Sequence, residues 1–349
     1  MNYAIVIGID HYEKKPLSGA VADAKAFANW LETKGGVQKE NLKLFVSNSE
    51  DLLVSGPEID IAIDKINRAA RNNNETNRLY FYFSGHGIGV TFDNTALCLR
   101  LWPALINHCI SGLDYRTWFT NAGAFDEVLI FFDCCREHDT LIKGNSPAGS
   151  WNLPIGNRNP RVLICNSTAY GKLSYEVLMD PASESDPDRV AATDALPKES
   201  ESDKKRGAFT TFLIDSLNGD ADSDGTGQIT ALALKDHIRN NFKSHAEKFK
   251  KTQDASADTL NGGDQILICT VPVILPEYNC IITFERNSNI TLYGPNFESV
   301  WQGDVVVGQI LKLPELAKGF HQLKDNLDTT VPPKTFINYS PKTISYERF

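Results

Sequence analysis

The sequence predicts an α/β protein with a doubly wound, mostly parallel sheet, followed by a small β-rich region. Three observations carry this prediction. Short runs that are continuously apolar recur through the first half of the chain, and amphipathic helical patterns separate them. Beyond Pro272 the runs become short and alternating, and Asn, Gly and Pro bound them. Strands that are apolar on both faces belong in a sheet that helices cover on both sides.

The expected elements alternate regularly along the first half of the chain. The apolar runs that predict strands are Ala4–Ile9, Leu42–Val46, Leu79–Phe83, Glu127–Phe132 and Arg161–Cys165. Two helices are predicted between the first three runs, at Ala20–Lys34 and Glu58–Asn72, because apolar residues recur there every three to four positions. The helices are therefore expected to cross from one parallel strand to the next.

A polar stretch at 180–206 divides the second half of the chain. It is charged and lacks aromatic residues, so it cannot bury enough apolar surface to offset its ordering entropy, and a flexible linker is predicted. Order is expected to resume at Gly207. The later predicted elements are helices at Gly207–Leu217 and Ala231–Lys250 and strands at Gln265–Val271, Cys280–Phe284, Asn289–Tyr293 and Val305–Leu311, with an extended tail from Asp328.

Composition excludes several classes of protein. Hydrophobic residues make up 42% of the chain and charged residues 23%, which is ordinary for a globular protein. The net charge is −9 and the basic residues are dispersed, so no nucleic-acid partner is predicted. No apolar run approaches the roughly 20 residues that cross a bilayer, so no membrane partner is predicted. The absence of a signal-peptide pattern and the odd number of cysteines, seven, predict a cytoplasmic location.

Two short motifs follow predicted strands and carry groups suited to catalysis. Ser84-Gly-His-Gly87 follows Leu79–Phe83, and Asp133-Cys-Cys-Arg136 follows Glu127–Phe132. The carboxyl ends of parallel strands share one edge of a sheet, where ligands bind. A histidine placed there can take the proton of a cysteine thiol that attacks a carbonyl carbon. His86 and Cys135 are therefore the predicted catalytic pair, with the backbone amides of Gly87 and Cys135 as oxyanion donors.

Each of these residues also has an ordinary interpretation. A histidine after a strand is often a hydrogen-bonded loop residue, and a buried cysteine is often inert packing. A zinc site formed with Cys134 is disfavoured, because adjacent residues of a strand point to opposite faces. The same alternation places Asp133 on the side of Cys135. A carboxylate there does not help to lower the pKa of the thiol, so Asp133 is expected to bind a basic substrate side chain.

Four motifs, in order along the chain, resemble the caspase-fold cysteine peptidases of family C14. They are Gly19-Ala-Val-Ala-Asp-Ala24, Ser84-Gly-His-Gly87, Asp133-Cys-Cys-Arg136 and Gly207-Ala-Phe-Thr-Thr-Phe-Leu213. The likeness is greater to metacaspases and their bacterial relatives than to animal caspases. It covers Met1–Val271 and implies a caspase-like peptidase domain over 1–271. Within that domain, 1–179 is large-subunit-like and 207–271 is small-subunit-like, and 272–349 is expected to be a β-rich accessory or regulatory domain.

The resemblance implies protein or peptide substrates and a role for each matching residue. Cys135 is the nucleophile and His86 the general base and acid, with a backbone carbonyl orienting the imidazole. Asp23 and Asp133 match the acidic residues with which metacaspases bind Arg or Lys before the cleaved bond. Two departures stand out: Arg136-Glu-His138 replaces His-Ser-Gly, and Ala20 replaces the usual cysteine. The resemblance also implies cutting between subunits, for which the basic candidates are Arg189, Lys198, Lys204, Lys205 and Arg206.

Other features leave alternatives open. No cofactor is expected to be required. Asp220–Thr230 resembles half of an EF-hand loop but lacks the final glutamate, so it predicts either weak calcium binding or a polar turn with Thr230 capping a helix. The protein is expected to be a regulated effector protease, made as a zymogen, with a role in antiviral defence or cell death. An activating small molecule or partner protein is expected to bind its C-terminal domain. The alternative is a silent caspase-fold scaffold or ligand-sensing module.

Overall fold

The chain divides into two compact units, each of which is described by itself. A computed structural model describes residues 1–49, 53–105, 107–139, 141–148, 158–178, 205–272, 280–313, 316–338 and 345–348. The first unit comprises Met1–Ala221 with Ile229–Cys269, and the second comprises Asp222–Gln228 with Thr270–Phe349. Among the described residues, no helix combines the length and apolar character that crossing a bilayer requires.

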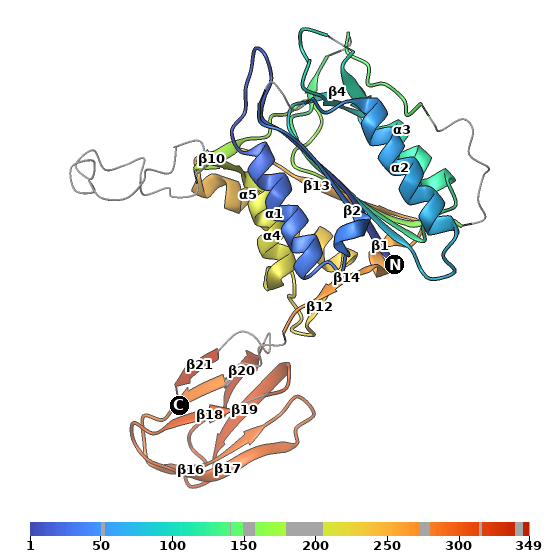
Figure 1. The fold of residues 1–349 in the computed structure, drawn as a ribbon. Helices are drawn as coiled ribbons and strands as arrows, with labels where there is room; N and C mark the ends of the chain where they lie inside the picture. Colours follow the sequence, from blue (N-terminus) through green and yellow to red (C-terminus); the bar gives the residue numbers. More distant parts are fainter. Residues whose placement is uncertain are drawn as a thin grey trace, which may run out of the picture. The chain divides into compact units, whose positions relative to one another are not determined.

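A six-stranded sheet forms the centre of the first unit (Figure 1). Its order is β13-β9-β7-β3-β1-β2, and every neighbouring pair is parallel except the edge pair of β13 and β9. The strands are β1 (Asn2–Ile9), β2 (Leu42–Ser47), β3 (Arg78–Ser84), β7 (Glu127–Asp133), β9 (Arg161–Asn166) and β13 (Ser256–Leu260). β3 and β7 are buried along almost their whole length, which confirms the predicted sheet covered on both faces.

Helices lie on both faces of this sheet (Figure 1). One face carries α1 (Ala20–Thr33), α4 (Ala208–Asp215) and α5 (Ala231–Lys248), and the other carries α2 (Gly56–Arg71) and α3 (Gly112–Asn121). α2 begins with a capping box, in which the backbone amide and the hydroxyl of Ser55 both donate to the Glu58 carboxylate. The carboxylate of Asp10 accepts hydrogen bonds from the first two amides of α1. The predicted doubly wound α/β class is therefore confirmed.

A close approach joins β1 to α1. An added Cβ at Gly8 would lie 2.5 Å from the Cβ of Ala24 and 2.7 Å from the carbonyl oxygen of Ala20. Only glycine fits at this distance, and α1 can then lie directly on the sheet. This contact fixes the start of α1, which carries Asp23, beside the carboxyl end of β1.

Several short strands lie outside the six-stranded sheet, and among these described short strands only β14 was predicted, within Gln265–Val271. A four-stranded sheet has the order β6-β5-β4-β8, and two further sheets pair β10 with β11 and β12 with β14. Their bounds are β4 (Gly87–Gly89), β5 (Thr95–Cys98), β6 (Cys109–Ser111), β8 (Glu137–His138), β10 (Glu176–Leu178), β11 (Lys205–Gly207), β12 (Gln228–Thr230) and β14 (Leu267–Thr270). Short helical turns occur at η1 (Lys39–Asn41), η6 (Ser216–Asp220) and η7 (Gly263–Gln265).

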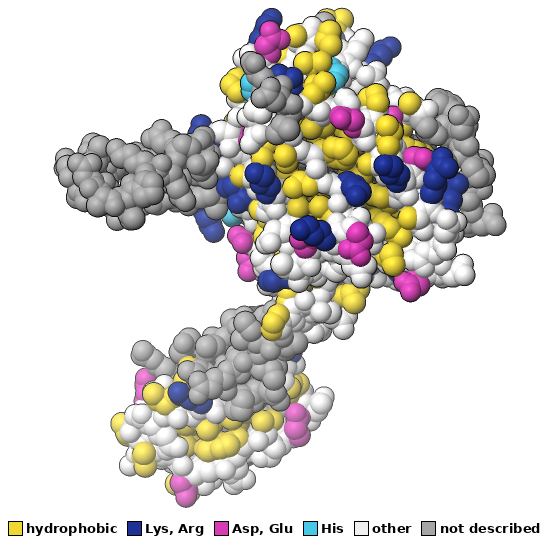
Figure 2. Space-filling model, viewed as in Figure 1, with side chains coloured by type: hydrophobic (Ala, Val, Ile, Leu, Met, Phe, Trp, Pro, Cys, Tyr) yellow, Lys and Arg dark blue, Asp and Glu magenta, His cyan; other side chains and the backbone are white. Residues whose placement is uncertain are grey.

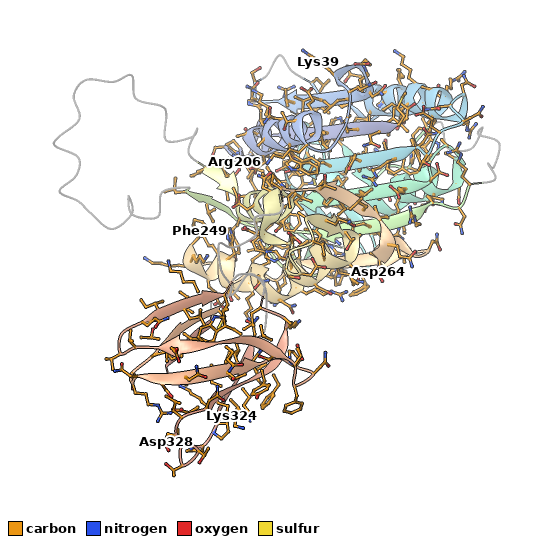
Figure 3. All side chains as sticks on the ribbon, turned by 90° about the horizontal axis from the view of Figure 1, so that it is seen from below. Lys39, Arg206, Phe249, Asp264, Lys324 and Asp328 are labelled. Carbon is orange, nitrogen blue, oxygen red and sulfur yellow. The ribbon has the colours of Figure 1, made fainter. Side chains whose placement is uncertain are left out.

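The predicted flexible linker needs correction at its end. Residues 180–204 lie outside the described part of the chain, but Lys205 and Arg206 form the first two residues of β11 (Figure 3). β11 pairs antiparallel with β10, and Arg206 forms an ion pair with Asp23. These long-range partners order two residues whose local composition gives no sign of structure.

The second unit contains two sheets, of order β18-β15-β21 and β17-β16-β19-β20. Its strands are β15 (Cys280–Thr283), β16 (Ser288–Tyr293), β17 (Ser299–Val305), β18 (Ile310–Leu313), β19 (Gly319–Asp325), β20 (Lys334–Asn338) and β21 (Ser345–Arg348). Apolar side chains, among them Ile282, Leu292 and Leu323, form its core. The predicted strand at Val305–Leu311 is wrong, because the chain turns through Gly308 at a φ of 78° between β17 and β18.

Candidate active site

The carboxyl ends of β3 and β7 border a cleft of about 180 Å³, called here the active-site cleft. Four of the five predicted site residues line it: Asp23, His86, Asp133 and Cys135. Gly87 does not line it. It begins β4, and an added Cβ there would lie 2.5 Å from the sulfur of the neighbouring Cys134. The other residues that line the cleft are Leu17, Ala20, Ser84, Gly85, Cys134, Ser174, Tyr175, Glu176 and Gly207.

Cys135 follows β7 by two residues and is half-buried. Its sulfur accepts a hydrogen bond from the amide of Ser174 at 3.3 Å and lies 3.5 Å from the carbonyl oxygen of the same residue. Burial raises the pKa of the Cys135 thiol, the Glu137 and Asp133 carboxylates raise it further, and the Ser174 amide lowers it. The thiol is therefore protonated in this resting arrangement.

His86 is held by its ring and by its backbone. Its Nε2 lies 2.7 Å from the carbonyl oxygen of Lys15, and its ring packs against Tyr12 and Trp102 at centroid distances of 4.5 and 5.3 Å. The backbone amide of His86 donates to the hydroxyl of Tyr12, which in turn donates to the carbonyl of Cys98. Because a carbonyl only accepts, Nε2 carries the proton and Nδ1 is the basic nitrogen of the neutral ring.

The imidazole of His86 is neutral in this environment. Burial lowers its pKa and the Lys15 ammonium lowers it further, while the hydrogen bond to the Lys15 carbonyl and the Glu176 carboxylate raise it. His86 and Cys135 both lie in the described part of the chain, and no hydrogen bond joins them there. The pair is therefore a neutral thiol and a neutral base in one cleft.

Asp23 and Asp133 approach each other across Gly207. Asp23 is 1% exposed and Asp133 is 5% exposed. An added Cβ on Gly207 would lie 2.3 Å from Oδ2 of Asp133 and 2.8 Å from Oδ2 of Asp23. Burial raises the pKa of both carboxyl groups, and in Asp23 the charge of Asp133 adds to the effect. Two carboxylates so close together in a buried site favour a cation between or beside them.

The partners of the two carboxylates differ. Asp133 accepts hydrogen bonds from the Ser174 hydroxyl at 3.0 Å and from the amide and hydroxyl of Thr210 at 3.1 and 2.7 Å. Asp23 accepts from the Gly207 amide at 2.6 Å and forms an ion pair with Arg206. The cation nearest to Asp23 is therefore one of the chain's own side chains, which the sequence had placed in the linker.

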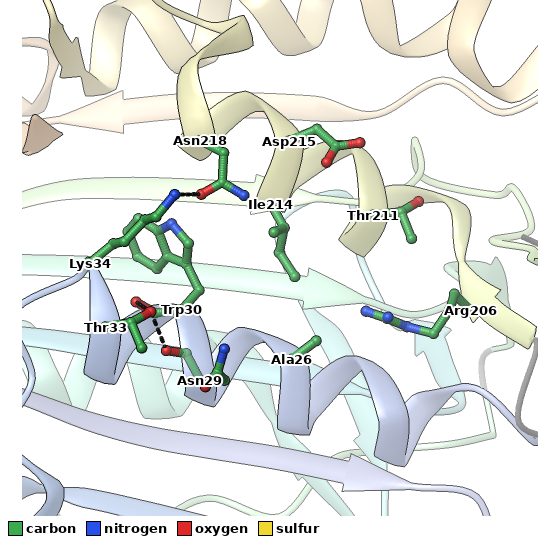
Figure 4. A pocket seen from close by; sticks show the side chains of 10 residues that line it. All are labelled: Ala26, Asn29, Trp30, Thr33, Lys34, Arg206, Thr211, Ile214, Asp215 and Asn218. Atoms are coloured by element: carbon green, nitrogen blue, oxygen red, sulfur yellow. Dashed lines mark hydrogen bonds between the residues drawn. The ribbon is translucent and has the colours of Figure 1, made fainter. Parts of the chain in front are cut away.

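Arg206 also lines a second pocket, of about 330 Å³, between α1 and α4 (Figure 4). Its guanidinium lies in this groove with Trp30 of α1 and Asp215 of α4. The indole Nε1 of Trp30 is buried and makes no hydrogen bond in the described structure. The side chain of Arg206 therefore lines the groove and at the same time forms an ion pair with the carboxylate of Asp23.

Sequence reasoning missed a segment that forms one wall of the active-site cleft. Ser174 donates its amide to the sulfur of Cys135 and its hydroxyl to Asp133, and Glu176 accepts hydrogen bonds from the amides of Ser18 and Gly19. The buried amide of Gln253 fastens this wall, since it accepts from the Tyr175 amide and donates to the Ser174 hydroxyl. The residues Ser174–Glu176 follow β9 without any recognisable motif, so only the fold could reveal them.

The acidic loop before α5 bonds largely to itself. Asp222 accepts from the amide of Gly227, and Asp224 accepts from the amide and hydroxyl of Thr226. Thr230 caps α5 by accepting from the Ala233 amide at 3.1 Å. Within the described residues, no group of three or more His, Cys, Asp or Glu side chains is placed to hold a metal ion.

The fold and this site together define a caspase-like peptidase arrangement. A thiol and an imidazole follow neighbouring parallel strands at one sheet edge, and two buried carboxylates lie beside them. The chain belongs to the caspase-domain family, peptidase family C14, which matches residues 1–262. On the face drawn in Figure 2, the Lys and Arg side chains of the first unit are spread among apolar and uncharged ones.

Similar proteins extend this picture. A probable protease of a Desulfuromonadales bacterium is 32% identical over 237 residues, which is 62% of this chain and 26% of that protein. The chain thus matches only about a quarter of that relative's length. Among solved structures, a Geobacter sulfurreducens protein is 13% identical, covers 78% of this chain and 99% of its own, and has a TM-score of 0.41. Caspase-1 of Spodoptera frugiperda is 14% identical, covers 77% and 88%, and has a TM-score of 0.42.

Proposed function

We propose that this protein is a cysteine endopeptidase that cleaves peptide bonds after Arg or Lys. The observation that carries the proposal is the active-site cleft, which places Cys135 and His86 beside the buried carboxylates of Asp23 and Asp133. Membership of the caspase-domain family supports the peptidase activity, and the paired carboxylates support the basic preference.

The proposed reaction proceeds through an acyl-enzyme. The sulfur of Cys135 attacks the substrate carbonyl carbon while its proton passes to Nδ1 of His86. The backbone amide of Cys135 stabilises the oxyanion, and His86 then gives the proton to the departing amine. A water molecule, deprotonated by His86, attacks the thioester, and collapse of that intermediate releases the carboxylic acid and restores the thiol. Since the resting pair is neutral, His86 acts as a general base rather than as a standing imidazolium.

The charges around Gly207 favour a basic substrate side chain. When ionised, Asp23 and Asp133 carry two negative charges, and Arg206 supplies one positive charge. One negative charge is then left without a cationic partner among these three residues. A guanidinium or ammonium group that enters the cleft neutralises this negative charge. An uncharged side chain in the same place would leave the charge buried and uncompensated.

The first test replaces each neighbouring cysteine in turn. Cys135→Ala should lower peptide hydrolysis by about 10⁴-fold or more, because it removes the nucleophile. Cys134→Ala is the matched control. Cys134 is buried, so its loss should cost about 1 kcal/mol of stability while most of the activity remains. Initial rates on a fluorogenic Arg peptide measure both, and undiminished hydrolysis by Cys135→Ala would refute the assignment.

The second test concerns the residue before the cleaved bond. Peptides that differ only in Arg, Lys, Gln or Asp at that position should show kcat/KM about 10- to 100-fold higher for Arg than for Gln. Asp133→Asn should reduce this ratio, since it removes one of the two negative charges. Faster cleavage after Asp than after Arg would rule out the basic preference and leave the identity of the nucleophile untouched.

A further inference from the structure

A buried cation lies directly after the nucleophile. The side chain of Arg136 is only 5% exposed. Its Nε donates to the hydroxyl of Thr95 at 3.0 Å, and Nη2 donates to the carbonyl of Phe92. Both acceptors are uncharged, and among the described residues no ion pair joins Arg136 to a carboxylate. Nη1 makes no hydrogen bond there, which leaves one edge of the guanidinium available.

Arg136 forms part of the wall of a cavity of about 340 Å³, called here the Arg136 pocket. Apolar side chains from two neighbouring strands, Ile130 and Phe132 of β7 and Ile164 of β9, also line it. The guanidinium carbon of Arg136 lies 6.0 Å from the ring centroid of Tyr170, which lines the pocket as well. The remaining lining residues are Phe92, Asp93, Thr95, Gly112, Leu113, Arg116, Asn166, Ala169, Ser256, Asp258 and Leu260.

The acidic residues that line the Arg136 pocket, Asp93 and Asp258, have partners of their own. Asp258 is 63% exposed at its side chain and forms an ion pair with Arg239 at 3.0 Å, and Asp93 accepts from the hydroxyl of Thr91 at 2.7 Å. Burial lowers the pKa of the Arg136 guanidinium, while the charges of Asp93 and Asp258 are among those that raise it. Neither carboxylate forms an ion pair with Arg136 in the described structure, which leaves direct contact with the guanidinium to a bound anion.

We propose that the Arg136 pocket binds a small organic anion with an apolar body. A carboxylate or phosphate head meets the guanidinium of Arg136, and the body lies against Phe132 and Ile164. The volume falls within the range of small-molecule sites, roughly 300–1,000 Å³, and apolar linings with a few convergent polar groups are typical of them. Arg116 lines the same pocket, as do the carboxylates of Asp93 and Asp258.

The Arg136 pocket is separate from the active-site cleft but connected to it. The two share no lining residue. The backbone of Arg136 donates to the carbonyl of Lys172 and accepts from the amide of Gly171. That loop leads within two residues to Ser174, which holds the sulfur of Cys135. The Arg136 pocket is thus a second site, distinct from the proposed peptidase cleft. Arg136, which would contact the head group of the ligand, directly follows the proposed nucleophile Cys135 in the sequence.

Binding of three probes of equal shape tests the proposal. Calorimetric titration of the full chain with 2-naphthoate, 2-naphthyl phosphate and the neutral 2-naphthamide should show at least one anion binding about tenfold or more tightly than the amide. The better of the two anions identifies the head group. Equal affinities for all three probes, or no binding of either anion, would overturn the proposal.

Variants locate the site. Arg136→Met should weaken binding of the preferred anion by about tenfold or more, and Leu113→Trp, which fills the pocket without altering the charge, should do the same. Arg68→Met on α2 is the matched loss of an exposed arginine, and Cys135→Ala alters only the cleft; both should bind as the wild type does. If Arg136→Met does not fold by circular dichroism, Leu113→Trp decides. Undiminished binding by Leu113→Trp would exclude this pocket.

Discussion

The thiol of Cys135 and the imidazole of His86 are both held in neutral form, because burial raises the pKa of one and lowers that of the other. The Lys15 carbonyl fixes the ring so that Nδ1 is its basic atom. In the proposed reaction, the pair becomes charged only when the thiol proton passes to the imidazole during attack.

The buried carboxyl groups predict a pH-dependent preference for basic substrates. The pKa values of Asp23 and Asp133 are raised, so these groups regain protons at a higher pH than ordinary aspartates and lose negative charge as the pH falls. The ratio of kcat/KM for an Arg peptide to that for a Gln peptide should therefore rise with pH through a range that lies above the one in which ordinary aspartates titrate. Titration of His86 and Cys135 affects both peptides alike and cancels in the ratio. Asp133→Asn should flatten the rise, whereas a flat ratio in the wild type would contradict the role of the carboxylates.

The sequence predicted four of the residues that meet in the cleft, but not the wall at Ser174–Glu176 or the ion pair of Asp23 with Arg206. His86, Cys135 and Asp133 follow apolar strands directly, so a parallel sheet must bring them to one edge. Asp23 depended on the resemblance to metacaspases. Its ion pair with Arg206 spans 183 residues and ends in a stretch whose composition predicts disorder, so no local pattern could reveal it.

At the scale of elements, the contact between β1 and α1 controls how closely the site-bearing helix approaches the sheet. Gly8→Ala should lower the free energy of unfolding by about 1–3 kcal/mol, because the new Cβ meets Ala24 and backbone atoms that cannot move independently. Gly56→Ala is the control. Its Cβ would meet its nearest neighbour at 3.7 Å at the start of α2, so it should be neutral or stabilising by up to about 1 kcal/mol. Urea unfolding measures both, and equal stability of the two variants would show that the approach is not tight.

Elements with strong periodicity were predictable, and elements defined by their partners were not. The strands β1, β3 and β7 are uninterrupted apolar runs. By contrast, β13 has one buried apolar residue, Ala257, and exists as a strand because β9 offers it an edge. α3 is rich in aromatic residues, which favour strands, and its helix is fixed by a Ser111 cap and by burial of Tyr115, Trp118 and Phe119.

At the scale of the whole molecule, every residue of the active-site cleft belongs to the first compact unit. The chain between β10 and β11 joins the two wall segments of that cleft, and it carries the basic residues that the proposed specificity would recognise. The peptidase is therefore expected to act on its own chain.

Incubated wild-type protein should cut itself after Arg189, Lys198 or Lys204, which lie outside the described residues, and not after Arg206. Arg206 is paired with β10 as part of β11, and the amide of Gly207 donates a hydrogen bond to Asp23. The peptide bond between Arg206 and Gly207 is therefore held in the fold and cannot enter the active site of another molecule. Intact-mass spectrometry identifies the products, with Cys135→Ala as the uncut control. Cleavage after Arg206, or in the Cys135→Ala protein, would contradict the expectation.

In the proposed function, Asp23 binds a basic substrate side chain, and Arg206 then competes with that side chain for the same carboxylate. Thermodynamic linkage makes the two effects equal. Arg206 lowers the affinity of Asp23 for a basic substrate side chain by the same factor as that side chain weakens the ion pair between Arg206 and Asp23. A ligand that binds the Arg206 guanidinium in the groove lined by Trp30 and Asp215 (Figure 4) would thus raise the affinity for substrate without contacting the substrate. On this proposal, the groove between α1 and α4 adjusts the selectivity of the active-site cleft.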